Sequence, residues 1–216
     1  MGYDLFKAAV AKKKNLAIYF VCHGQSEGDT LGEHCLVCQD TGITETGETQ
    51  AAALGKYFSA LSQPIKTIYT SVRNRTKVTA DAITAATGVT ALESDRLVER
   101  DWGKYRSYTW INLSEQLSKM NFDARYTFTP PEGESWQMME DRLFGVLTLM
   151  VEAAEPDDQL VVVTHHGCLR AILPLIDGSD RESHEDYSVE VGTITKYNGA
   201  MDKLEFINHL PPLNKS

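Results

Sequence analysis

A chain of 216 residues with 42% apolar and 24% charged residues has the composition of a globular protein, which argues against a disordered or fibrous chain. Its formal net charge of −9 argues against a protein that binds nucleic acid or a membrane through nonspecific basic contacts, so an anionic ligand must be held by a local cluster of positive charge. Four cysteines are too few for a disulfide scaffold, and we expect a reduced, cytoplasmic setting.

The N-terminal segment carries Tyr3, Phe6 and Val10 at helical spacing and ends in three lysines. Its apolar run is too short for a signal peptide or a transmembrane span. We expect an added helix within residues 1–15, packed on a single domain that spans residues 1–216. A helix lying on a membrane surface is the less favoured alternative, and we predict no membrane partner.

The segments that follow alternate between strand-like and helix-like patterns. Continuous apolar runs, typical of strands buried on both faces, occupy residues 16–21 (LAIYFV) and 160–164 (LVVVT). Further strands are predicted over residues 65–71 and 89–92. Helical periodicity extends over residues 44–61, 74–87 and 136–155, and from the end of the strand at 164 to residue 176. Thr44 is the expected N-cap of the first of these helices. This alternation predicts an α/β fold, a three-layer sandwich in which helices cover both faces of a mostly parallel sheet.

The stretch from Gly103 to Pro131 is the least regular part of the chain and is rich in Tyr, Ser and Thr. We expect it to form a helical excursion that covers the sheet edge. Four aromatic residues in this stretch or just before it are candidate walls of a substrate pocket, or alternatively ordinary core: Trp102, Tyr105, Tyr108 and Trp110.

Two of the predicted strands run directly into a histidine that is followed by glycine. The strand LAIYFV leads to His23-Gly24, and LVVVT leads to His165-His166-Gly167. Ligands in open α/β sheets collect beyond the carboxyl ends of the strands, and glycine lets the backbone turn tightly beside an imidazole. One histidine in such a place is usually structural, whereas two in the same context favour a shared site.

Two further charged elements point to the same end of the sheet. Arg73 and Arg75 lie where the second strand opens a helix, a place where a guanidinium and free backbone N–H groups together bind phosphate. A surface charge is the alternative for either arginine. Glu99 follows the short third strand and is expected to enter the same crevice.

Six segments in this order resemble the histidine phosphatase superfamily, which includes cofactor-dependent phosphoglycerate mutase: FVCHGQSEG, ITETGETQA, YTSVRNRTKVTADAI, LVERDWG, PPEGES and VVVTHHGCLRAIL. The similarity extends from about Leu16 to Ile176. It implies a phosphoglycerate mutase-like fold and phosphoryl transfer through a phosphohistidine. His23 would be the nucleophile, Arg75 and His166 would lie in the phosphate pocket, and Glu99 would be the proton donor.

The resemblance further implies a set of residues around the phosphate: Gly24, Gln25, Ser26, Arg75, His166 and Gly167. It implies no cofactor and no metal. The chemistry agrees with these roles, because phosphoryl transfer requires an unprotonated imidazole nitrogen, cationic donors on the phosphate oxygens and a proton for the leaving group. Histidine, with a reference pKa of about 6.5, is mostly neutral at pH 7.

The sequence departs from the family signature at Cys22, where relatives carry the arginine that clamps the phosphoryl group. Its loss would remove about 3–5 kcal/mol of transition-state binding, or roughly 10²–10⁴ in rate. Arg73, His165 or Arg106 are alternatives that would compensate in part. A nucleophilic Cys22 is disfavoured because no arginine follows it at the spacing used by cysteine phosphatases.

Three other features stay open. Asp29 replaces an asparagine common among relatives, and we expect it to face solvent or a substrate hydroxyl. His165 is either a sheet-edge or a pocket residue. The Cys35-Cys38 pair has CxxC spacing, but no second ligand pair lies nearby, so ordinary loop cysteines are favoured over a zinc or redox site.

The short segment between Glu99 and His166 favours the phosphatase branch, because mutases carry a long insert there. We therefore predict a phosphomonoester hydrolase that acts on a small phosphorylated substrate, with activity impaired by Cys22. The alternatives are a weak or inactive member that binds phosphate or a protein partner, and a mutase-type phosphotransferase. The oligomeric state stays open, with a dimer as one option.

Overall fold

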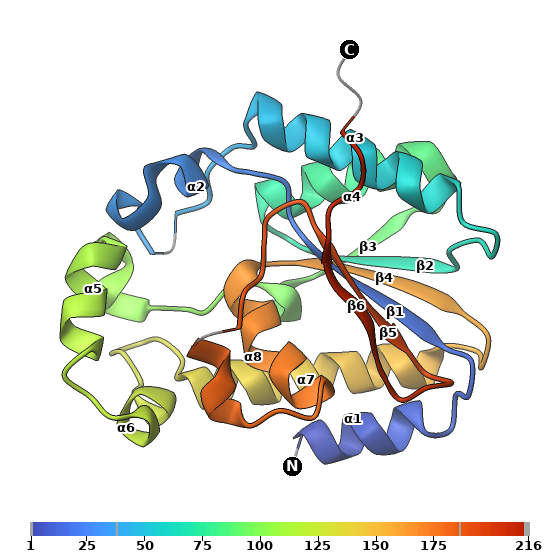
Figure 1. Ribbon diagram of the computed structural model, residues 1–216. Helices are drawn as coiled ribbons and strands as arrows, with labels where there is room; N and C mark the ends of the chain where they lie inside the picture. The colour runs from blue at the N-terminus through green and yellow to red at the C-terminus, as the bar shows by residue number, and fades with distance from the viewer. Residues whose placement is uncertain (1, 38, 186, 214–216) are drawn as a thin grey trace.

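In the computed structural model, which describes residues 2–37, 39–185 and 187–213, the strands form a mixed six-stranded sheet (Figure 1). Their order across the sheet is β3-β2-β4-β1-β5-β6. The four strands β1 to β4 pair in parallel, whereas β5 and β6 are antiparallel. The strands are β1 (Ala17–Cys22), β2 (Thr67–Ser71), β3 (Ala91–Ser94), β4 (Gln159–Thr164), β5 (Ile194–Asn198) and β6 (Lys203–His209). The predicted mostly parallel α/β sheet is confirmed.

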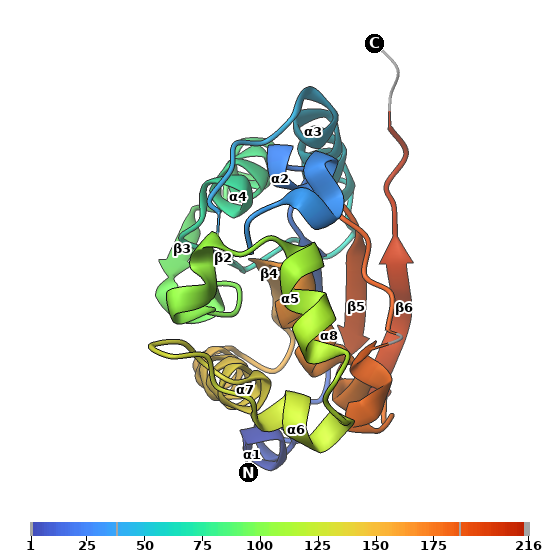
Figure 2. The ribbon, with the colours of Figure 1, turned by 90° about the vertical axis from the view of Figure 1, so that its left-hand side faces the viewer.

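Helices cover both faces of this sheet, as a three-layer sandwich requires (Figures 1 and 2). One face carries α3 (Glu45–Ser59) and α4 (Asn74–Thr87), and the other carries α1 (Gly2–Val10), α7 (Trp136–Ala153) and α8 (His166–Ile176). Side chains alternate along β1, so that Tyr19 and Val21 pack towards α3 and α4 while Ile18, Phe20 and Cys22 pack towards α7 and α8.

The N-terminal helix α1 packs against α7 through aromatic side chains. Phe6 is fully buried, with its ring centroid 5.6 Å from that of Phe144 and 6.3 Å from that of Tyr197. The helix ends at Val10, before the lysines. Among the described residues, no helix is both long enough and apolar enough to cross a membrane.

The irregular stretch after residue 102 is helical, as expected, but it lies beyond the carboxyl ends of the strands. A 3₁₀ turn (Gly103–Ser107) leads into α5 (Trp110–Leu117) and α6 (Phe122–Thr127), and Figure 2 shows α5 passing in front of the ends of the strands. The start of α5 is joined to the loop after α2 (Glu27–Leu31), because the Trp110 amide donates to the Cys35 carbonyl. This segment can therefore form one wall of a site at the carboxyl ends of the strands.

The antiparallel pair β5–β6 has no counterpart among the predicted strands. In β6 (KLEFINH) only Leu204 is buried, while the apolar Ile207 is exposed, and this pattern is weaker than the continuous apolar runs of β1 and β4. The third strand also begins two residues later than predicted, after α4 ends at the left-handed Gly88 (φ 75°).

Phe144→Ala is expected to lower the free energy of unfolding by about 3–5 kcal/mol, because Phe144 is fully buried between α1 and α7 and truncation leaves a cavity. Leu149→Ala on the exposed side of the same helix should change it by less than about 0.5 kcal/mol. Urea unfolding measures both values. Equal effects of the two substitutions would contradict the described packing of α1 on α7.

Candidate active site

The parallel register of β1 with β4 sets two histidines side by side. Cys22 is paired with Thr164, so the residues that follow, His23 and His165, leave neighbouring strands at the same level. The His23 amide donates to the Thr164 carbonyl, and the two ring centroids are 5.4 Å apart. Both side chains are buried. The residue opposite His23 is thus His165, while the predicted partner His166 is the first residue of α8.

Hydrogen bonds at both ring nitrogens define the tautomer of His23. Its Nδ1 lies 2.9 Å from the Gly24 carbonyl oxygen, which can only accept, so Nδ1 carries the proton. Its Nε2 receives a hydrogen bond from Nε of Arg75 at 3.0 Å, so Nε2 presents a lone pair. This is the nitrogen that a nucleophilic histidine would use.

The surroundings of His23 keep its imidazole neutral. Burial lowers the pKa of His23 from 6.5 to about 4, and the adjacent Arg75 guanidinium acts in the same direction. The Asp29 carboxylate, with Oδ2 4.0 Å from Nδ1, opposes this pKa shift but does not cancel it. The imidazole is therefore unprotonated at neutral pH, as nucleophilic attack requires.

Arg75 reaches His23 from the first turn of α4, where the sequence places it beside the strand end. Its side chain is 11% exposed, and Nη1 lies 3.6 Å from Oδ1 of Asp40 and 3.4 Å from the Gln39 carbonyl. Asp40 also accepts a hydrogen bond from the Asn74 amide at the start of α4. The guanidinium is thus held between the imidazole and the loop that precedes α3.

A cavity of about 390 Å³ brings the four predicted catalytic side chains together. The chemically important residues that line it are His23, Ser26, Asp29, Arg75, Glu99, His166 and Arg170. His166 is exposed at the wall formed by α8, whereas His23 lies at the buried end of β1. The structure therefore brings these side chains together at the carboxyl end of the sheet, where the two His-Gly segments predict a site.

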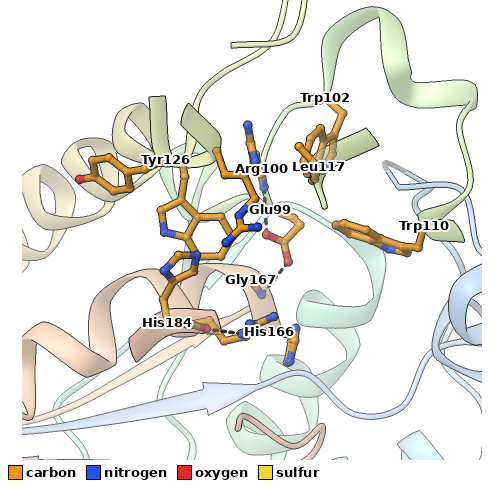
Figure 3. A pocket seen from close by; sticks show the side chains of 12 residues that line it. Glu99, Arg100, Trp102, Trp110, Leu117, Tyr126, His166, Gly167 and His184 are labelled. Atoms are coloured by element: carbon orange, nitrogen blue, oxygen red, sulfur yellow. Dashed lines mark hydrogen bonds between the residues drawn. The ribbon is translucent and has the colours of Figure 1, made fainter. Parts of the chain in front are cut away.

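Glu99 is fixed at the start of α8 by backbone amides. Its Oε2 accepts from the Gly167 N–H and its Oε1 from the Arg100 N–H, both at 3.0 Å (Figure 3). A Cβ on Gly167 would lie 2.4 Å from Oε1 of Glu99, so only glycine permits this close approach. The glycine after His166 therefore serves to place the carboxylate of Glu99.

The remaining predicted phosphate-binding residues divide into two groups. Ser26 lines the cavity, but its backbone N–H and its hydroxyl both donate to Asp29 Oδ2 in a capping box for α2. Gly24 and Gln25 are not brought to the cavity, because their N–H groups donate to Thr79 and to Gln50. Close packing of Gly24 on the Gly47 carbonyl explains why position 24 is glycine.

His165 lies behind His23 with one ring nitrogen unsatisfied. Its Nε2 is 2.9 Å from Oγ of Ser71, and its Nδ1 has no hydrogen-bond partner although the residue is fully buried. Burial, together with Arg75 and His23, keeps the pKa of His165 well below its usual value. His165 is thus an uncharged residue beneath the pocket. The sequence alone leaves open whether it is a pocket residue or a sheet-edge residue.

Cys22 points away from His23, into the layer beneath α7 and α8. It is fully buried, and burial raises the pKa of its thiol well above the usual value, with Asp29 and Glu99 adding to the rise. It does not line the cavity. A neutral, enclosed thiol of this kind is no nucleophile.

The sequence analysis names three possible replacements for the missing arginine, and none of them lines the cavity. Arg106 pairs with Asp101 at 2.8 Å on the surface, and Arg73 precedes α4 without lining the pocket. The missed residue is Arg170, which lines the cavity from α8. It stands four positions after His166 on a helix, so helical periodicity alone could have placed it on the same face.

Asp29 and the cysteine pair have plainer roles than their motifs suggest. Asp29 caps α2 through Ser26 instead of being turned wholly to solvent. Cys35 lines the cavity, while Cys38 falls outside the described residues. Across the described ranges, no group of three His, Cys, Asp or Glu side chains is arranged to hold a metal ion.

Of the four predicted aromatic walls, two line a second chamber next to this cavity. Trp102 and Trp110 line it together with Trp136 and Tyr126, which the sequence analysis missed (Figure 3). Tyr105 and Tyr108 instead stack on each other, with centroids 4.8 Å apart, outside both spaces.

Comparison with known proteins gives one matching family model, described as the histidine phosphatase superfamily (branch 1), over residues 18–208. The chain is 31% identical over 166 residues to the uncharacterized phosphatase PhoE of Bacillus subtilis, covering 77% of this chain and 80% of that protein. It is 29% identical over 171 residues to the 2,3-bisphosphoglycerate-dependent phosphoglycerate mutase of Brucella canis, covering 74% and 81%.

Solved structures share the fold at lower identity. A putative alpha-ribazole-5'-P phosphatase from Escherichia coli superposes with a TM-score of 0.75 at 18% identity, covering 90% of this chain and 97% of the other. The protein titled Mycobacterial hydrolase 1 gives a TM-score of 0.74 at 22% identity, covering 90% and 98%. These similarities show the fold and leave the substrate open.

The imidazole of His23 should remain neutral at pH 6, with its proton on Nδ1, because burial disfavours the cation and shifts the pKa down to about 4. An exposed histidine would be mostly protonated at that pH. ¹⁵N NMR titration measures the tautomer and the pKa, and His23→Gln assigns the signal. A midpoint near 6.5, or a proton on Nε2, would contradict the geometry.

Proposed function

Because this chain belongs to the histidine phosphatase superfamily (branch 1), we propose that it hydrolyses small phosphomonoesters through a phosphohistidine intermediate on His23. The observation that carries the proposal is the lone pair on Nε2 of His23. Nδ1 is bonded to the Gly24 carbonyl, and Nε2 is turned to Arg75 in a cavity that Glu99 also lines. A nucleophile, a phosphate-binding cation and an acid thus meet in one space.

In the first step, Nε2 of His23 attacks phosphorus, and the bond between phosphorus and the ester oxygen breaks. The electron pair of that bond passes to the leaving oxygen, which takes a proton from the Glu99 carboxyl group. The alcohol departs, and the phosphoryl group stays on His23. The two backbone N–H bonds to Glu99 support this role because they fix the direction of its carboxyl group.

In the second step, water attacks the phosphoryl group, and the bond between phosphorus and Nε2 breaks. The Glu99 carboxylate formed in the first step takes a proton from this water. Inorganic phosphate leaves, and His23 regains its lone pair. The site needs no group beyond its own side chains for these two steps.

Arg75 binds the phosphoryl oxygens once it moves off Nε2, because its guanidinium now lies where the phosphoryl group must bond. Arg170 supplies a second positive charge from the opposite wall. Beneath them, the unsatisfied Nδ1 of His165 supports a role as the inner partner of His23, with His166 on the outer wall. We propose that His165 and His166 share the role in the phosphate pocket that the sequence analysis gives to His166 alone.

Hydrolysis is favoured over mutase chemistry by the short segment between Glu99 and His166, although relatives of both kinds are similar to this chain. A weak phosphate-binding protein is the second candidate. Cys22 favours this candidate because it stands where relatives carry the arginine that clamps the phosphoryl group. The Asp40 carboxylate also favours it, because it lies 3.6 Å from the Arg75 guanidinium and competes with phosphate for it. The free thiols of Cys22, Cys35 and Cys168 fit the reducing cytoplasm in which we propose that the protein acts.

His23→Ala should abolish hydrolysis of 4-nitrophenyl phosphate, and Glu99→Gln should lower kcat on an alkyl phosphate by about 10²–10⁴, because the amide keeps the shape and removes the proton. Steady-state kinetics on purified variants measures both. His209→Ala and Glu93→Gln on the exposed surface serve as matched controls and should retain full activity. Wild-type rates in His23→Ala would mean that another site or a contaminant acts.

Cys22→Arg should raise kcat by about 10²–10⁴, because the charges of Asp29 and Glu99 act on the Cys22 thiol and a long side chain that turns from the core towards them would bring a guanidinium to the phosphoryl oxygens. Cys22→Gln, long and uncharged, is the control and should give no gain. Thermal unfolding of both variants checks that the buried site tolerates a longer side chain. A flat or lower rate in a folded Cys22→Arg protein would show that the clamp has been replaced or abandoned.

A further inference from the structure

A partly open chamber of about 220 Å³ lies beside the cavity of His23. The two spaces share Glu99, Trp110, His166 and Arg170 as common walls. The rest of the chamber is lined by Arg100, Trp102, Leu117, Arg125, Tyr126, Trp136, Gly167 and His184 (Figure 3). A ligand can therefore extend from one space into the other past Glu99.

The chain contains three tryptophans, and all three line this chamber. Trp102 meets Trp110 edge to face with centroids 5.6 Å apart, and Trp136 lies 4.3 Å from the ring of His184. Tyr126 adds its ring, while Figure 3 shows its hydroxyl pointing away from the pocket. These rings pack in pairs, and the pairs also border the open space of the chamber.

The walls of the chamber are held before any ligand binds. The Arg100 guanidinium lies 3.9 Å from the ring centroid of Trp102 and donates to the carbonyls of Glu134 and Phe128. The Trp110 amide donates to the Cys35 carbonyl. A preformed pocket loses little conformational entropy on binding, which favours affinity for a ligand of matching shape.

The position of Glu99 fixes what enters the chamber. The acid must touch the ester oxygen, with the phosphoryl group on one side of it and the alcohol carbon on the other. His23 and Arg75 lie on the phosphoryl side, in the larger cavity. Trp102 and Trp136 line only the chamber, on the other side of Glu99, and Trp110 lies between the two spaces. The chamber therefore receives the alcohol part of the ester.

We propose that the substrates of this enzyme are phosphomonoesters whose alcohol carries a flat aromatic ring, and that this ring is bound in the chamber. The inference rests on the hydrolysis proposed above. An apolar cavity of roughly 150 Å³ is enough to bind benzene, so the chamber accommodates one ring. Edge-to-face contacts with indole favour an aromatic ring over an alkyl chain of similar size.

The test compares kcat/KM for benzyl phosphate and cyclohexylmethyl phosphate, whose rings are similar in size. Both are esters of primary alcohols, so the difference in leaving-group reactivity is small and ring binding dominates. The wild-type protein should prefer benzyl phosphate by about tenfold or more. Trp110→Leu and Trp136→Leu should reduce this ratio to about threefold or less, while Tyr108→Leu, outside the chamber, should leave it unchanged.

A binding measurement separates this inference from hydrolysis itself. Benzylphosphonate, which has no ester bond to hydrolyse, should change the tryptophan fluorescence of the wild-type protein, because all three tryptophans line the chamber. Cyclohexylmethylphosphonate should change it much less. Trp110 is 38% exposed, so Trp110→Leu is expected to fold, and Trp110→Phe provides a milder variant that retains a ring.

Hydrolysis of both esters with no preference, and an equal response to both phosphonates, would overturn the chamber proposal and leave the hydrolase intact. A selective response to benzylphosphonate without any hydrolysis would support the chamber and overturn the proposed function. Loss of the preference in the Tyr108→Leu control as strongly as in Trp110→Leu would also contradict the assignment.

Discussion

The parallel pairing of β1 with β4 is the constraint from which the rest of the site follows. Cys22 opposite Thr164 brings His23 level with His165 and starts α8 one residue later, so that the Gly167 amide holds Glu99. A slip of one residue would turn each side chain to the other face of the sheet. Such a slip would exchange side chains of different size, such as Phe20 and Val21, between two close-packed layers, and this mismatch opposes it. Core packing and the arrangement of reactive groups are thus set by the same register.

The charge balance of the cavity follows from the same alternation. Position 22 faces α7 and α8 with the buried core, while position 23 faces α4 and Arg75. Among the described lining residues, the cations Arg75 and Arg170 share the cavity with the Asp29 carboxylate and with Glu99, the proposed proton donor. A dianionic phosphate binds best where positive charge is in excess. We therefore expect this cavity to bind phosphate more weakly than a cavity with one more guanidinium would.

Much of the fold and part of the site could be predicted from the sequence. The apolar runs identify β1 and β4 because both faces of these strands are buried, and His23 and Glu99 follow from their places after strands. The choice between His165 and His166 depends on a register between segments far apart in the chain, which no local pattern encodes. The chamber is likewise assembled from α5 to α8, and only tertiary packing shows that Trp136 joins Trp102.

The central claim is that His23 carries the phosphoryl group during turnover. The most direct measurement is rapid mixing of the protein with 4-nitrophenyl phosphate, quenching in alkali, where phosphohistidine survives, and mass-spectrometric mapping of the modified peptide. The account predicts a phosphoryl group on the imidazole of His23 that forms and decays at the rate of turnover. A phosphoryl group on His165, His166 or a cysteine, or turnover with no phosphoenzyme at any time point, would contradict it.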